Sequence, residues 1–230
     1  MRYVNSNVAR KIGRIYGWRQ KFFARRYRSI QISDEKEAQI ARLLYVLRQG
    51  VKERLVRSPL DWPGVHCAWN LVTGNMTTEG WWDDQTAAYR ARLKGEKVER
   101  GQFRSAETLT LSQIPAWEHL DRAAYREQMR MLVELVEEEA RASDRSFLGP
   151  EKVLRQNPHG TPSETKSSPA PFVHAATRAE RFRLRDAYSA FLYRYRIAAK
   201  SLQDGDLTAE FPPDCFPPRL PTADRPRPPT

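Results

Sequence analysis

The chain has 230 residues and a net charge of +11, all of it in residues 1–60, which hold 15 Lys or Arg against 4 Asp or Glu. No apolar run reaches the length of about 18 residues that a transmembrane helix needs, and the N-terminus lacks the apolar region of a secretory signal. The two cysteines, Cys67 and Cys215, exclude a disulfide framework and a cysteine-rich zinc site.

The first half of the chain predicts helices interrupted by one strand. The expected elements are a helix over 5–16, a strand over 22–32, a helix over 34–49, short helices over 65–73 and 82–95, and an extended segment over 109–117 that crosses back over the core. Asn5 or Ser6 would cap the first helix. Asp34 and Glu37 have the spacing of a capping box, so we expect the third element to begin at Asp34.

The second half predicts two long helices joined by a linker. A helix over 121–142 carries one apolar face, formed by Tyr125, Met129, Leu132 and Val136. Residues 156–176 are rich in Pro, Ser and Thr and predict a linker. Thr177 and Glu180 have capping-box spacing, and Gly205 can end the helix that they open. That helix has an apolar stripe typical of a core, namely Leu184, Tyr188, Phe191, Tyr195, Ala198 and Leu202.

The tail is rich in proline, since eight of the sixteen prolines lie in residues 212–230. Proline at this density disfavours packed helix or sheet. Pro218 and Pro221 have the spacing of a polyproline ligand. We expect instead a strap that Phe211 and Phe216 anchor.

The N-terminal segment combines cations with aromatic rings. Its basic residues are Arg10, Lys11, Arg14, Arg19, Lys21, Arg25, Arg26 and Arg28, and Tyr16, Trp18, Phe22, Phe23 and Tyr27 lie among them. Cations that track phosphates and rings that stack on bases favour binding of single-stranded or hairpin nucleic acid. An organellar transit peptide and a membrane-surface helix also fit an Arg-rich segment without acids. Much of Trp18, Phe22 and Phe23 can equally be core.

Motifs for several other chemistries are missing. No G-x-x-x-x-G-K-S/T or G-x-G-x-x-G loop occurs, so nucleotide hydrolysis and Rossmann-type chemistry have no support. The four histidines, His66, His119, His159 and His174, have no metal-ligand spacing. The acidic residues of the helix over 121–142 are interpreted as a solvated face.

Residues 23–56 resemble part of a known enzyme family. The stretch FARRYRSIQISDE, followed by YVLRQGVKERLV over 45–56, is similar to the C-terminal half of the catalytic domain in single-tyrosine HUH transposases, the REP-associated tyrosine transposases of insertion-element type. That family shows an aromatic-x-x-R-aromatic-basic-S strand and then a helix ending Y-I-H-L-N-P-V-R-A-G-L-V. SPLDWPG over 58–64 resembles its following turn, and the helix over 5–16 resembles its preceding helix.

The resemblance implies a specific chemistry. The family's tyrosine attacks a DNA phosphodiester and keeps the 5′-phosphate covalently, and Tyr45 matches this nucleophile. A divalent metal, Mg²⁺ or Mn²⁺, polarises the phosphate. The family takes one metal ligand from an amide four residues after the tyrosine, where Gln49 stands here; Gln49-Gly50 replaces the family's Asn-Pro pair. The DNA-binding residues would be Arg19, Lys21, Arg25, Arg26 and Arg28.

The resemblance also implies what is missing. The family's two principal metal ligands, a His-hydrophobic-His pair, and the first strands of its ferredoxin-like fold would precede Met1. We therefore expect an α+β chain: a partial ferredoxin-like (HUH) catalytic domain, then a mainly helical extension and a Pro-rich tail. The expected units are 1–75 (catalytic portion), 76–155 (helical extension), 156–176 (linker), 177–206 (long helix) and 207–230 (tail). We expect DNA binding without cleavage, and no metal bound by this chain alone.

Partners and location follow from the same resemblance. Single-stranded or hairpin DNA is the expected partner, with no membrane and with a homodimer as an open alternative, in a bacterial cytoplasm at the nucleoid. Two rival hypotheses stay open: a non-catalytic nucleic-acid-binding remnant, and a basic helical protein that binds a membrane surface or another protein.

Overall fold

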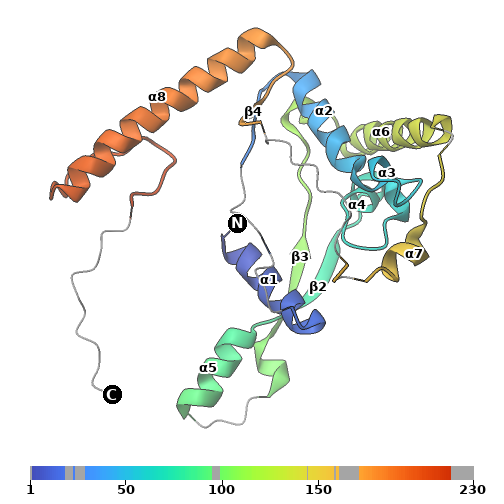
Figure 1. Cartoon of the computed structure of the whole chain (residues 1–230), viewed down its shortest axis with the longest axis horizontal. Helices are drawn as coiled ribbons and strands as arrows, with labels where there is room; N and C mark the ends of the chain where they lie inside the picture. The colour runs from blue at the N-terminus through green and yellow to red at the C-terminus, as the bar shows by residue number, and fades with distance from the viewer. Residues whose placement is uncertain are drawn as a thin grey trace.

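The computed structural model describes residues 2–18, 23, 29–94, 99–143, 145–157, 159–160 and 171–218. Within them the chain is rich in helix and carries two small two-stranded sheets, which confirms an α+β class in the general sense (Figure 1). The helices are α1 (Arg2–Tyr16), α2 (Lys36–Leu47), α3 (Gln49–Lys52), α4 (Ala68–Thr73), α5 (Asp84–Lys94), α6 (Arg122–Ala142), α7 (Pro150–Leu154) and α8 (Arg178–Gln203). The strands are β1 (Gln31–Ile32), β2 (Thr77–Trp82), β3 (Arg104–Leu109) and β4 (Val173–His174). Short 3₁₀ turns lie at Pro59–Asp61, Arg100–Phe103 and Pro115–Trp117.

Helix α6 is the scaffold of the hydrophobic core. The carboxylate of Asp121 caps it and accepts the N–H groups of Ala123 and Ala124, both at 2.8 Å. One face of the helix is buried, at Tyr125, Met129, Val133, Val136 and Ala140. The predicted helix is therefore confirmed, although Val133 takes the buried place expected for Leu132, which lies at the edge of the core.

The core joins the predicted 1–75 and 76–155 ranges. Its buried members are Leu47, Val51, Val56, Ala68, Leu71, Trp117, Tyr125, Met129, Val136 and Ala140. Half of them come from α2, α3, α4 and the segment between, and half come from the Pro115–Trp117 turn and α6. The apolar side chains of α2, α3 and α4 are thus buried against α6 and the Pro115–Trp117 turn.

A long β-ribbon leaves this core and carries α5 (Figure 1). Strands β2 and β3 pair antiparallel, from Thr77 opposite Leu109 to Trp82 opposite Arg104. The sequence did not predict this pair. The segment expected to be extended over 109–117 is strand only at Leu109 and ends in the Pro115–Trp117 turn, because Pro115 opens that 3₁₀ turn. A Cβ at Gly80 would lie 2.8 Å from the Arg104 guanidinium, so a side chain here would have to displace that of Arg104.

The N-terminal elements differ from the prediction at their ends. Helix α1 begins at Arg2, so Asn5 and Ser6 lie inside it and do not cap it. Of the strand expected over 22–32, only Gln31–Ile32 is strand among the described residues, and residues 24–28 lie outside them. It pairs in parallel with β4, which falls within the predicted linker over 156–176.

Helix α8 extends away from the core (Figure 1). The prediction that its apolar stripe forms a core was wrong for most of the stripe, because only Leu184 and Ala198 are buried. The tail covers part of the stripe. The Phe211 ring lies 5.4 Å from the Tyr195 ring, and the Tyr195 hydroxyl donates to the Phe216 carbonyl at 3.2 Å. Phe211 thus anchors the expected strap, whereas the Phe216 side chain is exposed. Gly205 ends the helical region at φ +105°.

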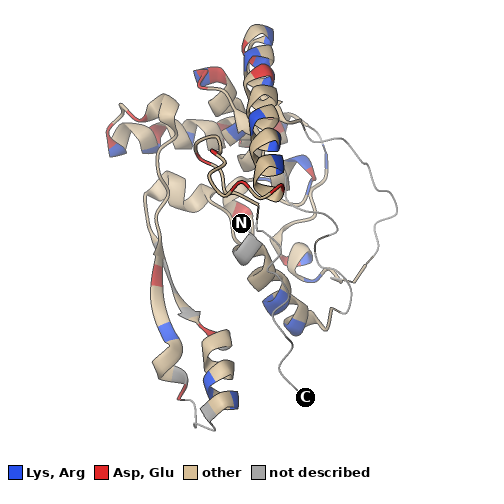
Figure 2. Ribbon diagram, turned by 90° about the vertical axis from the view of Figure 1, so that its left-hand side faces the viewer, with Lys and Arg blue, Asp and Glu red and all other residues tan. Residues whose placement is uncertain are grey.

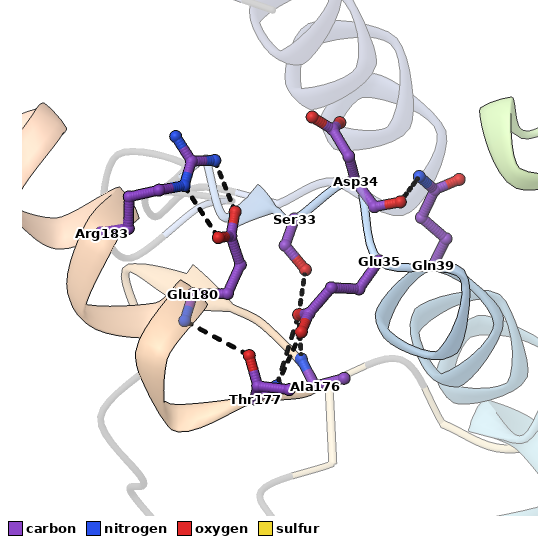
Figure 3. A network of polar contacts seen from close by, with 8 residues as sticks. All are labelled: Ser33, Asp34, Glu35, Gln39, Ala176, Thr177, Glu180 and Arg183. Atoms are coloured by element: carbon purple, nitrogen blue, oxygen red, sulfur yellow. Dashed lines mark hydrogen bonds and ion pairs between the residues drawn. The ribbon is translucent and has the colours of Figure 1, made fainter.

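A carboxylate at the start of α2 fixes the start of α8 (Figure 3). Glu35 accepts the Ser33 hydroxyl at 2.7 Å and the N–H groups of Ala176 and Thr177 at 2.7 and 3.0 Å. The predicted Asp34–Glu37 capping box was therefore wrong: Glu35 is the N-cap, and its side chain does not cap its own helix. The sequence pattern did not reveal this role of Glu35, because the amides that it binds lie 141 and 142 positions further along the chain.

The predicted cap of α8 is half confirmed. The Thr177 hydroxyl accepts the Glu180 N–H at 3.3 Å, as in a capping box. The Glu180 carboxylate pairs with Arg183 instead of bonding back to Thr177, and Glu35 accepts the Thr177 N–H in its place (Figure 3). A residue at the start of α2 thus completes the hydrogen bonds at the start of α8.

Replacing Glu35 is expected to loosen the start of α8. Hydrogen bonds from Thr177 and then Ser33 hold the pKa of Glu35 below its ordinary value. A group whose pKa is lowered in the folded state stabilises that state above its unfolded-state pKa, and this contribution is lost as the pH falls through the folded-state pKa. Glu35→Gln should therefore speed hydrogen exchange at the Ala176 and Thr177 amides at pH 7, and it should reduce the acid-induced loosening that we expect of the wild type.

Glu37→Gln is the matched control, because Glu37 is exposed and lies in the first turn of the same helix. The other charged groups near Glu35 are Asp34, Glu180 and Arg183, with Glu180 and Arg183 paired to each other. Equal exchange at the Ala176 and Thr177 amides in the wild type and Glu35→Gln would contradict this role of Glu35.

Candidate nucleic-acid interface

Tyr45 lies on the outer face of α2 beneath two cations. Its side chain is 46% exposed. The Arg42 guanidinium carbon lies 4.6 Å from the centre of the Tyr45 ring, and the Lys52 Nζ lies 6.0 Å from it. Cations placed this way are attracted to the ring face, and they would also attract a phosphate brought to the hydroxyl.

Gln49 lies beside Tyr45, as the i, i+4 spacing predicts. Helix α2 ends at Leu47, and the short α3 begins at Gln49 after Arg48, whose backbone stays helical. The Gln49 side-chain amide donates to the Tyr45 carbonyl oxygen at 3.1 Å. No donor to the Gln49 side-chain oxygen is found within the described ranges.

The residues around Gln49 do not fit a divalent metal site. A single neutral amide is a weak ligand, and magnesium sites in proteins use carboxylates. No group of three or more His, Cys, Asp or Glu suited to holding a metal occurs within the described residues. The side chains over the neighbouring Tyr45 are Arg42 and Lys52, both cations that repel a metal ion.

The predicted DNA-binding residues Arg19, Lys21, Arg25, Arg26 and Arg28 lie outside the described residues. The aromatic neighbours that are described belong partly to the fold. The Trp18 ring stacks on His159 at 5.2 Å, and His159 also contacts the Tyr16 carbonyl at 2.9 Å. The prediction that some of this aromatic content is structural therefore holds for Trp18, whereas Phe23 is 44% exposed.

Three basic residues of the N-terminal segment, Arg10, Lys11 and Arg14, line a cavity between α1 and α5. Its volume is about 360 Å³. The lining residues are Asn7, Arg10, Lys11, Arg14, Trp82, Asp83, Gln85, Ala88, Tyr89 and Arg92. Lys11 spans the two sides, since its ammonium donates to the Trp82 carbonyl at 3.1 Å. Figure 2 shows the Lys and Arg positions along these helices.

Asp83, the one carboxylate among the described residues that line this cavity, is engaged in capping α5. It accepts the Thr86 hydroxyl at 2.7 Å and the Gln85 and Thr86 N–H groups at 3.2 and 3.1 Å. These bonds, led by the Thr86 hydroxyl, hold the pKa of Asp83 below its ordinary value. Arg10, Arg14 and Arg92 make no ion pair with any residue that the structure describes. The cavity therefore keeps three cationic groups available to an anion.

Sequence reasoning missed the α5 half of this cavity. Arg10 and Arg14 belong to the basic segment, but Trp82, Tyr89 and Arg92 lie much further along the chain. The available signal was the pair of tryptophans ahead of a helix with Arg90, Arg92 and Lys94. Their position beside α1 depends on the β2–β3 ribbon, which the sequence pattern did not reveal.

Comparison with known proteins identifies no relative: no protein family, no curated protein and no solved structure matches this chain. In the described part of the chain, no helix has the length and apolarity needed to cross a bilayer.

Proposed function

We propose that this chain is a transposase-like protein that binds single-stranded or hairpin DNA and does not cleave it unaided. The observation that supports binding most strongly is the α1–α5 cavity. Arg10 and Arg14 line it from one helix and Arg92 from the other, and Trp82 and Tyr89 add aromatic rings. Tyr89 is 64% exposed, so its ring is accessible to a base.

The physical basis is the pairing of charge with stacking. Guanidinium groups bind backbone phosphates and release condensed counterions, which gives an affinity that depends on salt but not on sequence. Exposed rings beside them stack on unpaired bases and contribute about 1–3 kcal/mol per base. A duplex offers no free base faces, so this combination favours single strands and hairpin loops.

The proposal of binding without cleavage comes from the Tyr45 face. In the resemblance to HUH-type transposases, residues 1–75 are the C-terminal half of a ferredoxin-like catalytic domain, with Tyr45 as nucleophile and Gln49 as one metal ligand. Tyr45 and Gln49 are adjacent, in keeping with that assignment. Gln49 is also the sole metal ligand that the resemblance assigns within this chain, and its surroundings are cationic.

The test is the salt dependence of binding to a labelled hairpin and a labelled single strand. For a single strand, each phosphate that the protein no longer neutralises should lower the absolute slope of log affinity against log salt by about 0.7. Arg10→Gln with Arg14→Gln should therefore lower it by about 1.4. Arg181→Gln with Arg185→Gln is the matched control, because these exposed arginines have the same i, i+4 spacing on α8. An unchanged slope in the α1 variant would remove the cavity from the interface.

The same samples test the lack of cleavage. With Mg²⁺ or Mn²⁺ present, a denaturing gel is expected to show no DNA covalently attached to the protein. An adduct that forms in the wild type and is lost in Tyr45→Phe would overturn this part of the proposal and assign the nucleophile.

The rival hypothesis, a protein that binds a membrane surface, predicts the opposite binding pattern. Vesicles that contain anionic lipid and the two oligonucleotides can be compared at one ionic strength. Binding to the vesicles without binding to either oligonucleotide would contradict DNA binding altogether.

A further inference from the structure

A second cationic pocket lies beside the helical core, at the end of α6. Two backbone bonds build it: the Leu148 N–H donates to the Arg54 carbonyl, and the Gly149 N–H donates to the Leu55 carbonyl, both at 2.9 Å. Arg54 has φ +58°, a left-handed conformation that turns the chain back after α3. The turn after α3, the end of α6 and residues 145–149 are thereby held together.

Two adjoining cavities open between these segments. The larger, of about 550 Å³, is lined by Arg57, Ser58, Glu137, Ala140, Arg141, Arg145, Ser146 and Phe147. The smaller, of about 200 Å³, shares Ala140, Arg145 and Phe147 with it. It adds Arg48, Val51, Lys52, Arg54, Glu139 and Ser143. Because Arg145 and Phe147 line both cavities, they stand at the boundary between them.

The larger cavity carries a net positive charge, since three arginines and one carboxylate, Glu137, line it. Arg57, Arg141 and Arg145 all line it, and none of the three makes an ion pair with a described residue. Arg141 donates to the Glu137 backbone carbonyl at 3.3 Å, not to its carboxylate. Three guanidinium groups around one cavity repel each other, and the single carboxylate of the lining offsets this repulsion only in part.

The smaller cavity is already partly neutralised. Glu139 accepts both the Nε and an Nη of Arg48, which fixes that arginine to α6. The larger cavity also holds a carboxylate, Glu137, but none of its three arginines forms an ion pair with it. Lys52 and Arg54 leave the smaller cavity positive as well, so the larger cavity is distinguished by its volume and not by its charge.

We infer that the pocket of Arg57, Arg141 and Arg145 binds a phosphate group. A guanidinium presents two parallel N–H donors that match two phosphate oxygens, and several of them around one cavity can bind one group together. Ser58 and Ser146 line the same cavity and add hydroxyl donors. The Arg57 guanidinium lies 5.9 Å from the centre of the Phe147 ring, a contact that restrains its position. The phosphate can belong to a nucleic-acid backbone or to a free phosphorylated compound.

The test measures binding of inorganic pyrophosphate and of a short single-stranded oligonucleotide by calorimetry. We expect Arg145→Gln to weaken binding of at least one of them about tenfold or more, because a hydrogen bond to a charged group is removed. Arg155→Gln is the control, since Arg155 is exposed at the end of the neighbouring α7 and does not line either cavity. If the melting temperature shows that Arg145→Gln is poorly folded, Arg141→Gln takes its place.

The outcomes separate the two sources of phosphate and the two sites. Pyrophosphate binding that falls in Arg145→Gln, but not in the α1 double variant, places a free phosphorylated compound here. Binding of the oligonucleotide alone, weakened by Arg145→Gln, places a backbone phosphate here even if the α1–α5 cavity proves inactive. Equal affinities of the wild type and Arg145→Gln for both probes, or no binding of either, would overturn the inference.

Discussion

Met129→Ala is expected to lower the free energy of unfolding by about 3 kcal/mol. The side chain is fully buried on α6, at the centre of the shared core. Truncating a buried Met removes its transfer free energy and leaves a cavity, and together these cost about 2–5 kcal/mol. Because α2 and α6 bury their side chains in the same cluster, amide exchange should speed up in both helices.

Met131→Ala is the matched control for this variant. Met131 lies two residues further along α6, and its side chain is 44% exposed. Exposed substitutions of this kind change stability by about 0.5 kcal/mol or less. Chemical denaturation monitored by circular dichroism measures the free energy of unfolding of both variants. Faster exchange in α6 with unchanged exchange in α2 would show that the two helices do not share one core.

Gly50→Ala is expected to destabilise the chain, although alanine is the better helix former. A Cβ at this position would lie 2.9 Å from the Trp62 ring and 3.0 Å from a Val56 methyl group. Val56 is fully buried and cannot move aside. Overpacking of this kind costs about 1–3 kcal/mol, which exceeds the gain of about 1 kcal/mol in helix propensity.

Gly13→Ala is the control for this second variant. Gly13 also lies within a helix, but its nearest neighbour would be the Trp18 carbonyl oxygen at 3.8 Å, an ordinary contact. We therefore expect Gly13→Ala to raise the melting temperature or leave it unchanged. If Gly50→Ala also melts at or above the wild-type temperature, the contact between α3 and Trp62 is not tight. Tight packing against Trp62 explains why residue 50 has no side chain.

Elements that depend on local patterns were predictable. The α6 helix follows from apolar residues at helical spacing, and the start of α8 follows from Thr177. The contact between Tyr45 and Gln49 follows from their i, i+4 spacing. In each case the interacting groups lie within a few turns of one helix, so the sequence places them close together whatever the rest of the chain does.

Elements that depend on distant partners were not predictable. The two-residue strand β1 exists because β4 pairs with it, and the pairing joins Gln31 to Val173, far apart in the chain. Glu35 has the sequence context of a helix start, but its carboxylate binds the amides of Ala176 and Thr177. A short strand or a lone carboxylate carries no periodic pattern that reveals its partner, so only the folded structure shows it.

The sequence by itself determined the positive charge of residues 1–60, the long helices and the lack of a phosphate-binding loop. Tertiary structure decided where that charge acts. It placed Arg10 and Arg14 across from Arg92, and it placed Arg57 with Arg141 and Arg145. Charge and helical periodicity are local properties of a chain, whereas a binding cavity needs side chains from separate segments, which only long-range packing brings together.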